Sequence, residues 1–282
     1  MANTAALRAA CIIGWPVEHS RSPLMHNHWI GKYGINGIYR REAVTPEDFP
    51  RFIASLADRG YAGANVTQPH KEMALRLSAP DAGARAVGVA NTLWFEGGRL
   101  HSTNTDVEGF VGALDASALG WDRTAEQALV IGAGGAARAV IFGFLERGVQ
   151  RIHVVNRTIE KAEALQTVFG PRVLPADWSR LPALLKTANV ITNATDLGMH
   201  GRAALTIDLS PARDDAVVAD VVYVPLKTAL LEQAKARGLR TSDGLDMLLY
   251  QAGRGFEKWF GVRPTVTPEL RAIMEQDIEG KK

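Results

Sequence analysis

The stretch "ALVIGAGGAARAV", residues 128–140, constrains the fold of this chain more than any other. An apolar run, expected as a buried strand, enters a glycine-rich turn and leaves it as a helical pattern. Gly132, Gly134 and Ala137 fit the spacing G-x-G-x-x-A, which allows a tight turn, a close backbone approach to a pyrophosphate and packing of the helix against the strand. Free N–H groups at the helix start attract phosphate oxygens. The stretch predicts a dinucleotide-binding domain of the Rossmann type.

The residues after the next strand indicate which dinucleotide is bound. The run "RIHVV" is followed by Asn156, Arg157 and Thr158, where an enzyme specific for NAD would place an acidic side chain against the ribose 2′-hydroxyl. No carboxylate stands there, and the planar, permanently charged guanidinium of Arg157 suits a 2′-phosphate. We therefore expect NADP as the cofactor. A solvated arginine at a strand end is the alternative interpretation.

Composition limits the classes of partner. The chain has 282 residues, of which 46% are hydrophobic, enough to form a substantial core in one large or two modest domains. Its 32 basic and 30 acidic residues give a net charge of +2 and no overall field that would attract nucleic acid or a membrane. No apolar run reaches the roughly 18 residues of a membrane span, and the first residues lack the pattern of a signal peptide. We expect a cytoplasmic protein that binds small molecules.

Alternating strand and helix patterns predict an α/β architecture in both halves of the chain. From about residue 11 to 95, short apolar runs alternate with helical periodicity, which is typical of a mostly parallel sheet. The runs "TLWF" and "LHST" flank "EGGR" and predict a β-hairpin. We expect a first α/β domain over residues 1–114, the dinucleotide-binding domain over 115–243 and C-terminal helices over 244–282, with a hinge at 115–124.

Lys71 and Asp106 in the first domain are candidates for proton transfer. An alcohol that loses a hydride to a nicotinamide also loses its hydroxyl proton, and a positioned base contributes roughly 10²–10⁴-fold in rate. Lys71 stands in "NVTQPHKE", just after a strand end and in the first turn of a helix, where the helix dipole disfavours a cation. Asp106 in "NTDVEGF" offers the partner carboxylate. Taken singly, each is also explained as a surface charge or a helix cap.

No metal site is expected. Cys11 is the single cysteine, so the chain has no internal disulfide and cannot form a metal site from cysteines; its apolar neighbours predict a core position. His19, His26, His28 and His70 lie near the proposed site in sequence, but their spacing gives no metal ligand set. We expect these histidines to pack or to support their neighbours.

Short motifs follow one another along the chain in the order "HSRSP", "NVTQPHK", "ANTL", "NTDVEGF", "GAGGAARA", "NRT", "NATDLGM", "VVYVP" and "DGLDMLLYQA". In these motifs the chain resembles the shikimate dehydrogenase family, from about Ile12 to Gly261. The resemblance implies NADP-linked interconversion of 3-dehydroshikimate and shikimate in aromatic amino-acid biosynthesis. It also implies hydride transfer in a cleft between a substrate domain and the NADP domain.

The resemblance implies a substrate site as well. Ser20 and Ser22 would bind the substrate carboxylate, which suits hydroxyls at a helix start with free N–H groups nearby; a pure N-cap role is the alternative for Ser22. Lys71 and Asp106 would form the catalytic pair, with Lys71 transferring the proton. The other implied substrate contacts are Thr67, Asn91, Tyr223 and Gln251. Because Gln251 follows the cofactor domain in sequence, the C-terminal helices are expected to return to the substrate domain.

The residues that hold NADP are implied in the same way. The pyrophosphate would lie on Gly132, Ala133, Gly134, Gly135 and Ala136, and the adenosine phosphate on Asn156, Arg157 and Thr158. Thr195, Gly244 and Met247 would lie along the cofactor toward the nicotinamide. Gln68 and Asp196 depart from the family pattern, and Asp196 would weaken the binding of an anionic cofactor if it faced the phosphates.

Other functions are consistent with part of the sequence. A quinate or quinate/shikimate dehydrogenase would share the fold, but quinate-preferring members often carry a threonine in place of a substrate serine, and NAD users carry an acidic residue near Arg157. A non-catalytic NADP or ligand sensor would have no need of both Lys71 and Asp106. A tRNA-dependent reductase would need a nucleophilic cysteine, and Cys11 is expected in a buried strand. The oligomeric state is expected to be a monomer or a homodimer.

Overall fold

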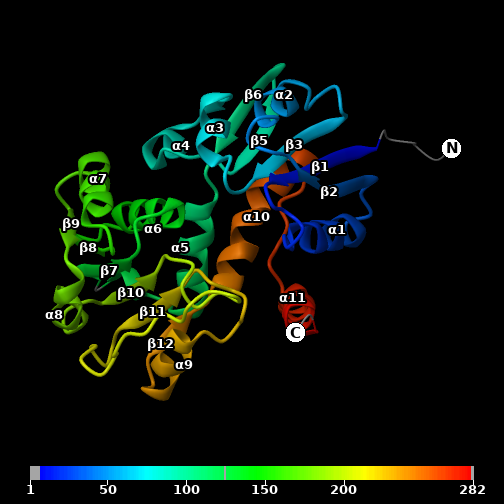
Figure 1. The fold of residues 1–282 in the computed structure, drawn as a ribbon. Coiled ribbons are helices and arrows are strands. Elements are labelled where there is room, and N and C mark those ends of the chain that lie inside the picture. The colour runs from blue at the N-terminus through cyan, green and yellow to red at the C-terminus, as the bar shows by residue number, and fades with distance from the viewer. Residues whose placement is uncertain (1–6, 124, 281–282) are drawn as a thin grey trace. The chain divides into compact units, whose positions relative to one another are not determined.

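The computed structural model describes residues 7–123 and 125–280, which form two compact α/β units (Figure 1). The first unit takes in the described residues up to Thr105 together with Gln251–Met274. The second takes in Asp106–Tyr250 and the described residues from Glu275 onward. The chain passes from the first unit to the second at Asp106 and returns to the first at Gln251. Both residues were expected in the substrate site.

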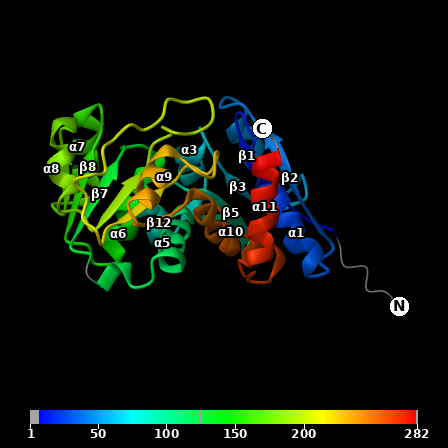
Figure 2. The same cartoon turned by 90° about the horizontal axis from the view of Figure 1, so that it is seen from below.

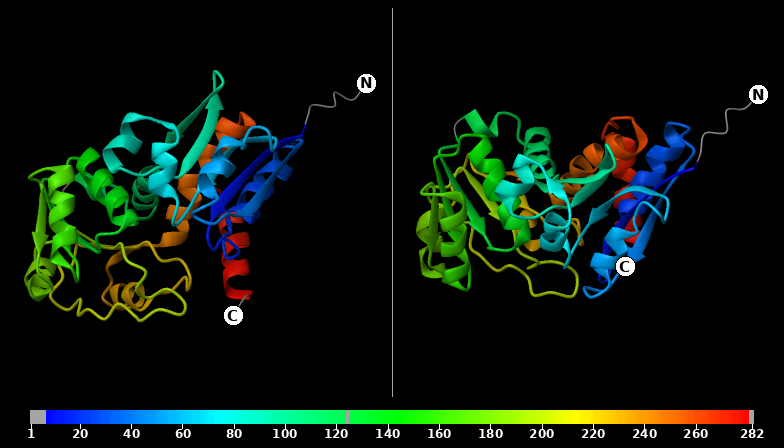
Figure 3. Two further views of the ribbon diagram at one scale, coloured as in Figure 1. Left: turned by 45° about the horizontal axis from the view of Figure 1, so that its top comes forward. Right: turned by 90° about the horizontal axis from the view of Figure 1, so that it is seen from above.

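The sheet of the first unit has the strand order β2-β1-β3-β5-β6-β4. Strand β1 pairs in parallel with β2 and β3, and β4 pairs in parallel with β6. Strand β5 is antiparallel to β3 and β6, which confirms the expected hairpin; Figure 3 shows it, in teal, at the top of the left panel. The strands are β1 (Arg8–Gly14), β2 (Gly37–Ala43), β3 (Tyr61–Val66), β4 (Ala79–Pro80), β5 (Thr92–Glu96) and β6 (Arg99–Thr103).

Helices of the first unit bury one apolar face against this sheet. In α2 the side chains of Phe49, Phe52 and Ile53 join a core cluster that also contains Cys11 and Ile13 of β1. The burial of Cys11 confirms its expected core position. The helices are α1 (Ser22–Lys32), α2 (Phe49–Ala54), α3 (Lys71–Arg76), α4 (Ala82–Val87), α10 (Gly244–Phe260), which enters this unit at Gln251, and α11 (Pro268–Gly280), which leaves it after Met274.

The sheet of the second unit has the order β12-β11-β10-β7-β8-β9, and its described pairings are parallel. Successive residues of β7 face opposite ways, because Ala128 and Val130 belong to one core cluster and Leu129 and Ile131 to another. Both faces are therefore covered, as in a doubly wound Rossmann domain. The strands are β7 (Gln127–Ile131), β8 (Arg151–Val155), β9 (Val173–Ala176), β10 (Val190–Asn193), β11 (Val217–Asp220) and β12 (Arg240–Ser242).

Helix α5 (Asp106–Ser117) is part of the second unit and lies beside α6 (Gly135–Glu146), as Figures 1 and 2 show. The ring of Phe110 packs edge-on against Phe144, with centroids 5.1 Å apart, and Arg147 binds the carboxylates of Asp115 and Asp122. The expected domain boundary at residue 114 therefore lies inside a helix of the second unit. Residues 115–123 of the expected hinge are also attached to this unit, and residue 124 lies outside the described residues. The remaining elements are η1 (Trp121–Arg123), α7 (Ile159–Phe169), η2 (Trp178–Arg180), α8 (Leu181–Leu185) and α9 (Ala229–Ala236).

Some local features differ from the sequence-based expectations. Ser22 is not an N-cap: it is already the first residue of α1, because its backbone N–H donates to Ser20 Oγ at 3.3 Å and Arg21 takes the N-cap position. Strands β9 and β12 were not expected, since each is only a few residues long and adds to an edge of the sheet. Within the described chain, no helix combines the length and the apolar character needed to cross a membrane.

Candidate functional site

Residues expected to contact the substrate follow the carboxyl ends of β1 and β3. Ser20 and Ser22 come after β1, and the Ser20 carbonyl accepts hydrogen bonds from Arg41 Nε at 3.0 Å and Nη2 at 2.7 Å. Thr67 comes after β3, and its backbone N–H donates to Ile13 O at 2.9 Å. A Cβ on Gly14 would lie 2.4 Å from Thr67 Cγ2, so only glycine at position 14 leaves room for this threonine.

Asn91 and Gln251 meet although they are far apart in sequence. Asn91 is 3% exposed, and its Nδ2 donates to Gln251 Oε1 at 3.0 Å. Its Oδ1 accepts the Thr105 backbone N–H at 2.8 Å. In the same helix as Gln251, Trp259 Nε1 donates to Leu93 O at 2.8 Å. The first unit thus contains Gln251 beside Asn91, as a substrate site made from both residues requires.

Tyr39 and Asn65 belong to the same hydrogen-bonded cluster, and sequence reasoning missed both. Tyr39 is buried, and its hydroxyl donates to Asn65 Oδ1 at 2.6 Å and is also hydrogen-bonded to the Ser22 side chain. Burial, with a smaller contribution from Cys11, raises the pKa of Tyr39 well above its usual value, so the hydroxyl stays protonated. Asn65 Nδ2 continues the network to Asn91 O at 3.2 Å. A polar side chain at the end of the apolar strand "YAGANV" was the signal for Asn65; Tyr39 gave none.

Two of the histidines near this site, His26 and His70, are buried and stack on aromatic rings. His26 is fully enclosed and stacks on Tyr39 with centroids 4.1 Å apart, and burial lowers its pKa to about 3, so the ring is neutral. His70 stacks on Phe49 and bonds the Val44 carbonyl through Nε2 at 2.8 Å. His19, in contrast, is exposed and does not pack. Across the described residues no group of three or more histidine, cysteine, aspartate or glutamate side chains is placed to hold a metal.

Lys71 and Asp106 each open a helix. Lys71 is the first residue of α3, half-buried, and its carbonyl accepts the Ala90 backbone N–H at 3.0 Å. Asp106 is the first residue of α5, is 6% exposed, and follows Thr105, which Asn91 holds. Since Lys71 lies in the first unit and Asp106 opens the second, their pairing stays a prediction.

The glycine turn of the second unit is open where a phosphate would lie. Gly134 and Gly135 at the start of α6 are exposed, and a Cβ built on either would meet nothing within 4 Å. Gly132 has a φ of +111°, which favours glycine, and a Cβ there would lie 2.7 Å from Thr195 Cγ2. The turn therefore presents free backbone N–H groups at the helix N-terminus, with Thr195 against its first glycine.

The other residues expected to hold NADP lie at the same carboxyl edge of the sheet. After β8, Arg157 and Thr158 are exposed, and Asn156 Nδ2 donates to Thr158 O at 2.7 Å. Gly244 is the first residue of α10, and Met247 lies one turn later. Half-buried Tyr223, expected to contact the substrate, follows β11. The Asp196 carboxylate is paired with Arg202 Nε at 3.2 Å, which offsets its charge toward an anionic ligand.

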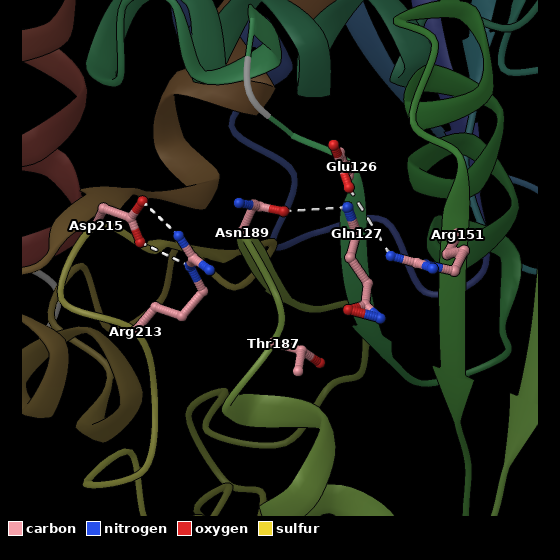
Figure 4. A pocket seen from close by; sticks show the side chains of 7 residues that line it. All are labelled: Glu126, Gln127, Arg151, Thr187, Asn189, Arg213 and Asp215. Atoms are coloured by element: carbon pink, nitrogen blue, oxygen red, sulfur yellow. Dashed lines mark hydrogen bonds and ion pairs between the residues drawn. The ribbon is translucent and has the colours of Figure 1, made fainter.

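A polar pocket of about 500 Å³ lies at the opposite, amino edge of this sheet (Figure 4). Its charges are matched within the pocket, because Arg213 Nε bonds Asp215 at 2.8 Å and Arg151 lies 3.9 Å from Glu126. The lining residues are Glu126, Gln127, Arg151, Thr187, Asn189, Arg213 and Asp215. None of the expected cofactor residues line it, so the glycine-turn edge is the better candidate for the cofactor site.

Comparisons with known proteins match both units. A model described as shikimate dehydrogenase substrate binding domain matches residues 12–93, and one described as shikimate / quinate 5-dehydrogenase matches residues 115–200. The shikimate dehydrogenase (NADP(+)) of Rhodopseudomonas palustris strain TIE-1 is 61% identical over 277 residues, which cover 98% of this chain and 99% of that protein.

Solved structures agree with this similarity. Shikimate 5-dehydrogenase from Thermus thermophilus, in complex with NADP(H) and shikimate, has a TM-score of 0.84 and 34% identity over 98% of this chain and 99% of that one. Quinate dehydrogenase from Corynebacterium glutamicum, in complex with NAD, has a TM-score of 0.86 and 28% identity over 95% and 99%.

Proposed function

Because this chain belongs to the shikimate dehydrogenase family, we propose that it catalyses the reversible, NADP-dependent reduction of 3-dehydroshikimate to shikimate. The observation that carries the proposal is the 61% identity, over 98% of the chain, to a relative named for this reaction and this cofactor. The residues assigned below are supported by their local geometry within each unit.

The substrate is held by the hydrogen-bonded cluster of the first unit. Ser20 and Ser22 bind its carboxylate through their hydroxyls, near the N-terminus of α1, where a negative charge is favoured. Asn91 and Gln251, whose amides are joined at 3.0 Å, and Thr67, for which Gly14 makes room, bind the ring hydroxyls. Tyr223 of the second unit adds a further contact. These fixed donors and acceptors suit a small polyhydroxylated acid.

Lys71 and Asp106 handle the proton. In the oxidation of shikimate, Lys71 Nζ accepts the hydroxyl proton, and in the reduction of 3-dehydroshikimate it returns that proton to the carbonyl oxygen. Asp106 holds the ammonium group that Lys71 becomes and accepts a hydrogen bond from another substrate hydroxyl. The bound cofactor would supply the hydride as NADPH in the reduction and take it up as NADP+ in the oxidation.

The second unit binds the cofactor at the carboxyl edge of its sheet. The N–H groups of the turn from Gly132 to Ala136 bind the pyrophosphate, and the open space over Gly134 and Gly135 fits that role. Asn156, Arg157 and Thr158 bind the adenosine end, with the exposed guanidinium reading the 2′-phosphate. Thr195, Gly244 and Met247 line the path to the nicotinamide.

A steady-state assay tests this function. Shikimate and quinate are each crossed with NADP and NAD, and reduced nicotinamide is followed by its absorbance. The proposal predicts a large preference for shikimate with NADP. Comparable rates with quinate or NAD would place the protein in the broader quinate/shikimate group, to which the similarity with the C. glutamicum enzyme points. No turnover in any of the four assays would indicate a non-catalytic NADP or ligand sensor.

The proposed partners follow from this function. They are shikimate or 3-dehydroshikimate and NADP, with no nucleic acid or membrane partner. The cytoplasmic location and the monomeric or homodimeric state stay predictions.

A further inference from the structure

A buried carboxylate at the end of β11 gathers the loops of the cofactor edge. Asp220 is 3% exposed. Its Oδ1 accepts hydrogen bonds from Asn193 Nδ2 at 2.9 Å and from the Val222 backbone N–H at 3.0 Å, and its Oδ2 accepts one from Thr228 Oγ1 at 2.7 Å. Asp220 therefore ties the ends of β10 and β11 to the start of α9, where Thr228 is the N-cap.

Asn193 passes this connection to Thr195. Its Oδ1 accepts the Thr195 hydroxyl at 2.7 Å and the Thr195 backbone N–H at 3.1 Å, while its Nδ2 also donates to Leu197 O at 3.1 Å. The Leu197 backbone N–H in turn donates to Thr195 Oγ1 at 3.1 Å. Thr195 is thus held through both its backbone and its side chain, and Asn193 is the residue that holds it.

The same cluster touches two more residues expected to hold NADP. Thr195 Cγ2 and the Ala194 carbonyl close off the space beside Gly132, where a Cβ would lie 2.7 and 3.0 Å away. A Cβ on Gly244 would lie 2.3 Å from Val221 O and 2.7 Å from the Val222 carbonyl carbon. Since Asp220 accepts the Val222 N–H, the segment that Gly244 packs against is fixed by the same carboxylate.

We propose that Asn193 and Asp220 are positioning residues of the cofactor site, which hold Thr195, the glycine turn and the start of α10 in the arrangement that binds NADP. This inference rests on the proposed function, because it takes NADP as the ligand. Neither residue has to touch the cofactor; each acts through the residues it fixes. Burial raises the pKa of Asp220 to about 6, so at neutral pH it is a carboxylate that only accepts hydrogen bonds, as the three donors around it require.

The test measures NADP and shikimate binding separately at pH 7.5, by calorimetric titration of the purified full-length protein. Asn193→Ala is expected to weaken NADP binding about tenfold, since it removes the hydrogen bonds that orient Thr195. Shikimate binding is expected to stay within about twofold of the unmodified protein. Steady-state kinetics should agree, with a raised KM for NADP and an unchanged KM for shikimate.

Variants in the same strand separate positioning from loss of stability. Ile191→Ala removes a fully buried apolar side chain of β10 and destabilises the domain by a cavity, without touching the Asp220 cluster. Thr192→Val removes a buried hydroxyl for which the described residues offer no hydrogen-bond partner. Both are expected to bind NADP as the unmodified protein does. Asp220→Ala, in contrast, is expected to weaken NADP binding about tenfold, because it leaves Asn193 Nδ2, the Val222 N–H and the Thr228 hydroxyl without their shared acceptor.

Each outcome decides the question. Unchanged NADP affinity in Asn193→Ala overturns the positioning role. An Ile191→Ala protein that is as stable to heat as Asn193→Ala and loses as much NADP affinity also overturns it. If Asn193→Ala does not fold, Asn193→Ser replaces it. The single oxygen of the shorter serine side chain cannot span the distance between Asp220 and Thr195 that the two ends of the Asn193 amide bridge, so the same tenfold loss is expected. If the unmodified protein itself fails to bind NADP, the proposed function falls together with this inference.

Discussion

The Asn91 side chain donates to Gln251 Oε1 at 3.0 Å, and the two residues stand 160 positions apart in the sequence. Asn91 also holds Thr105, the residue directly before Asp106. One buried amide therefore links α10 to the residue just before the chain enters the second unit. An Asn91 variant would disturb the positions of Gln251 and Thr105 together.

Lys71→Ala should reduce turnover at least about a hundredfold, because the proton then lacks its positioned acceptor. NADP affinity should change by no more than a few fold, since the lysine lies in the first unit and the NADP residues lie in the second. Steady-state rates and NADP titration measure the two effects. Lys32→Ala, an exposed charge at the end of α1, is the matched control. Near-normal turnover in Lys71→Ala would remove the lysine from the chemistry.

Arg157→Ala should weaken NADP binding about 10- to 100-fold, as expected for the loss of a charge-assisted contact to a phosphate. NAD binding should stay within about threefold. Titration with both dinucleotides gives the ratio. Lys186→Ala makes the same charge change at an exposed position of the second unit and should affect neither ligand. Equal losses for NADP and NAD would show that Arg157 does not read the 2′-phosphate.

Tyr39→Phe should lower the free energy of unfolding by about 1–3 kcal/mol, because Asn65 Oδ1 is left buried without its donor. The KM for shikimate should rise about fivefold, since the Ser22 hydroxyl loses a partner. Denaturant unfolding and kinetics measure the two quantities. Tyr33→Phe, at a half-buried tyrosine that packs on Phe256, should change neither. An unchanged KM in Tyr39→Phe would separate this tyrosine from the substrate site.

His26 should make the protein less stable as the pH falls. Its pKa is about 3 in the folded protein, against the ordinary 6.5 in the unfolded chain. Below pH 6.5 the unfolded chain therefore binds a proton that the folded protein does not. This stability is complete above pH 6.5 and is lost toward pH 3, by an amount on the order of 5 kcal/mol. His26→Phe, which keeps an aromatic ring against Tyr39, should show a flatter dependence in denaturant unfolding. Parallel curves for both proteins would contradict the buried neutral ring.

The pH dependence of stability that Asp220 causes should have the opposite sign to that of His26. Its folded pKa of about 6 lies above the ordinary 3.8, so the folded protein binds the extra proton between these values. The contribution of Asp220 to the free energy of unfolding is therefore greatest below pH 3.8. It is lost as the pH rises to 6, by an amount on the order of 3 kcal/mol. The difference in unfolding free energy between Asp220→Asn and the unmodified protein should grow over this interval and level off above pH 6. A difference independent of pH would contradict the raised pKa.

The sequence predicted the features that follow local rules. The glycine turn, the buried strand before it and the hairpin around "EGGR" all follow from patterns within a short stretch. The expectation that Ser22 caps the helix was wrong, because the Ser20 hydroxyl, two residues earlier, accepts the Ser22 backbone N–H. Tyr39 with Asn65, and Asn193 with Asp220, join different strands through side chains, and such pairs leave no periodic signal in the sequence.

Helix α10 carries a further consequence. Gly244, Met247 and Gln251 are spaced three and four residues apart in this continuous helix, which places them on one face. Inserting or deleting one residue between Met247 and Gln251 would turn Gln251 by about 100° around the helix axis relative to Gly244 and Met247. Substitutions on the other faces of this segment leave that alignment intact, whereas a change in its length does not. The number of residues between Met247 and Gln251 is therefore under stricter constraint than their identity.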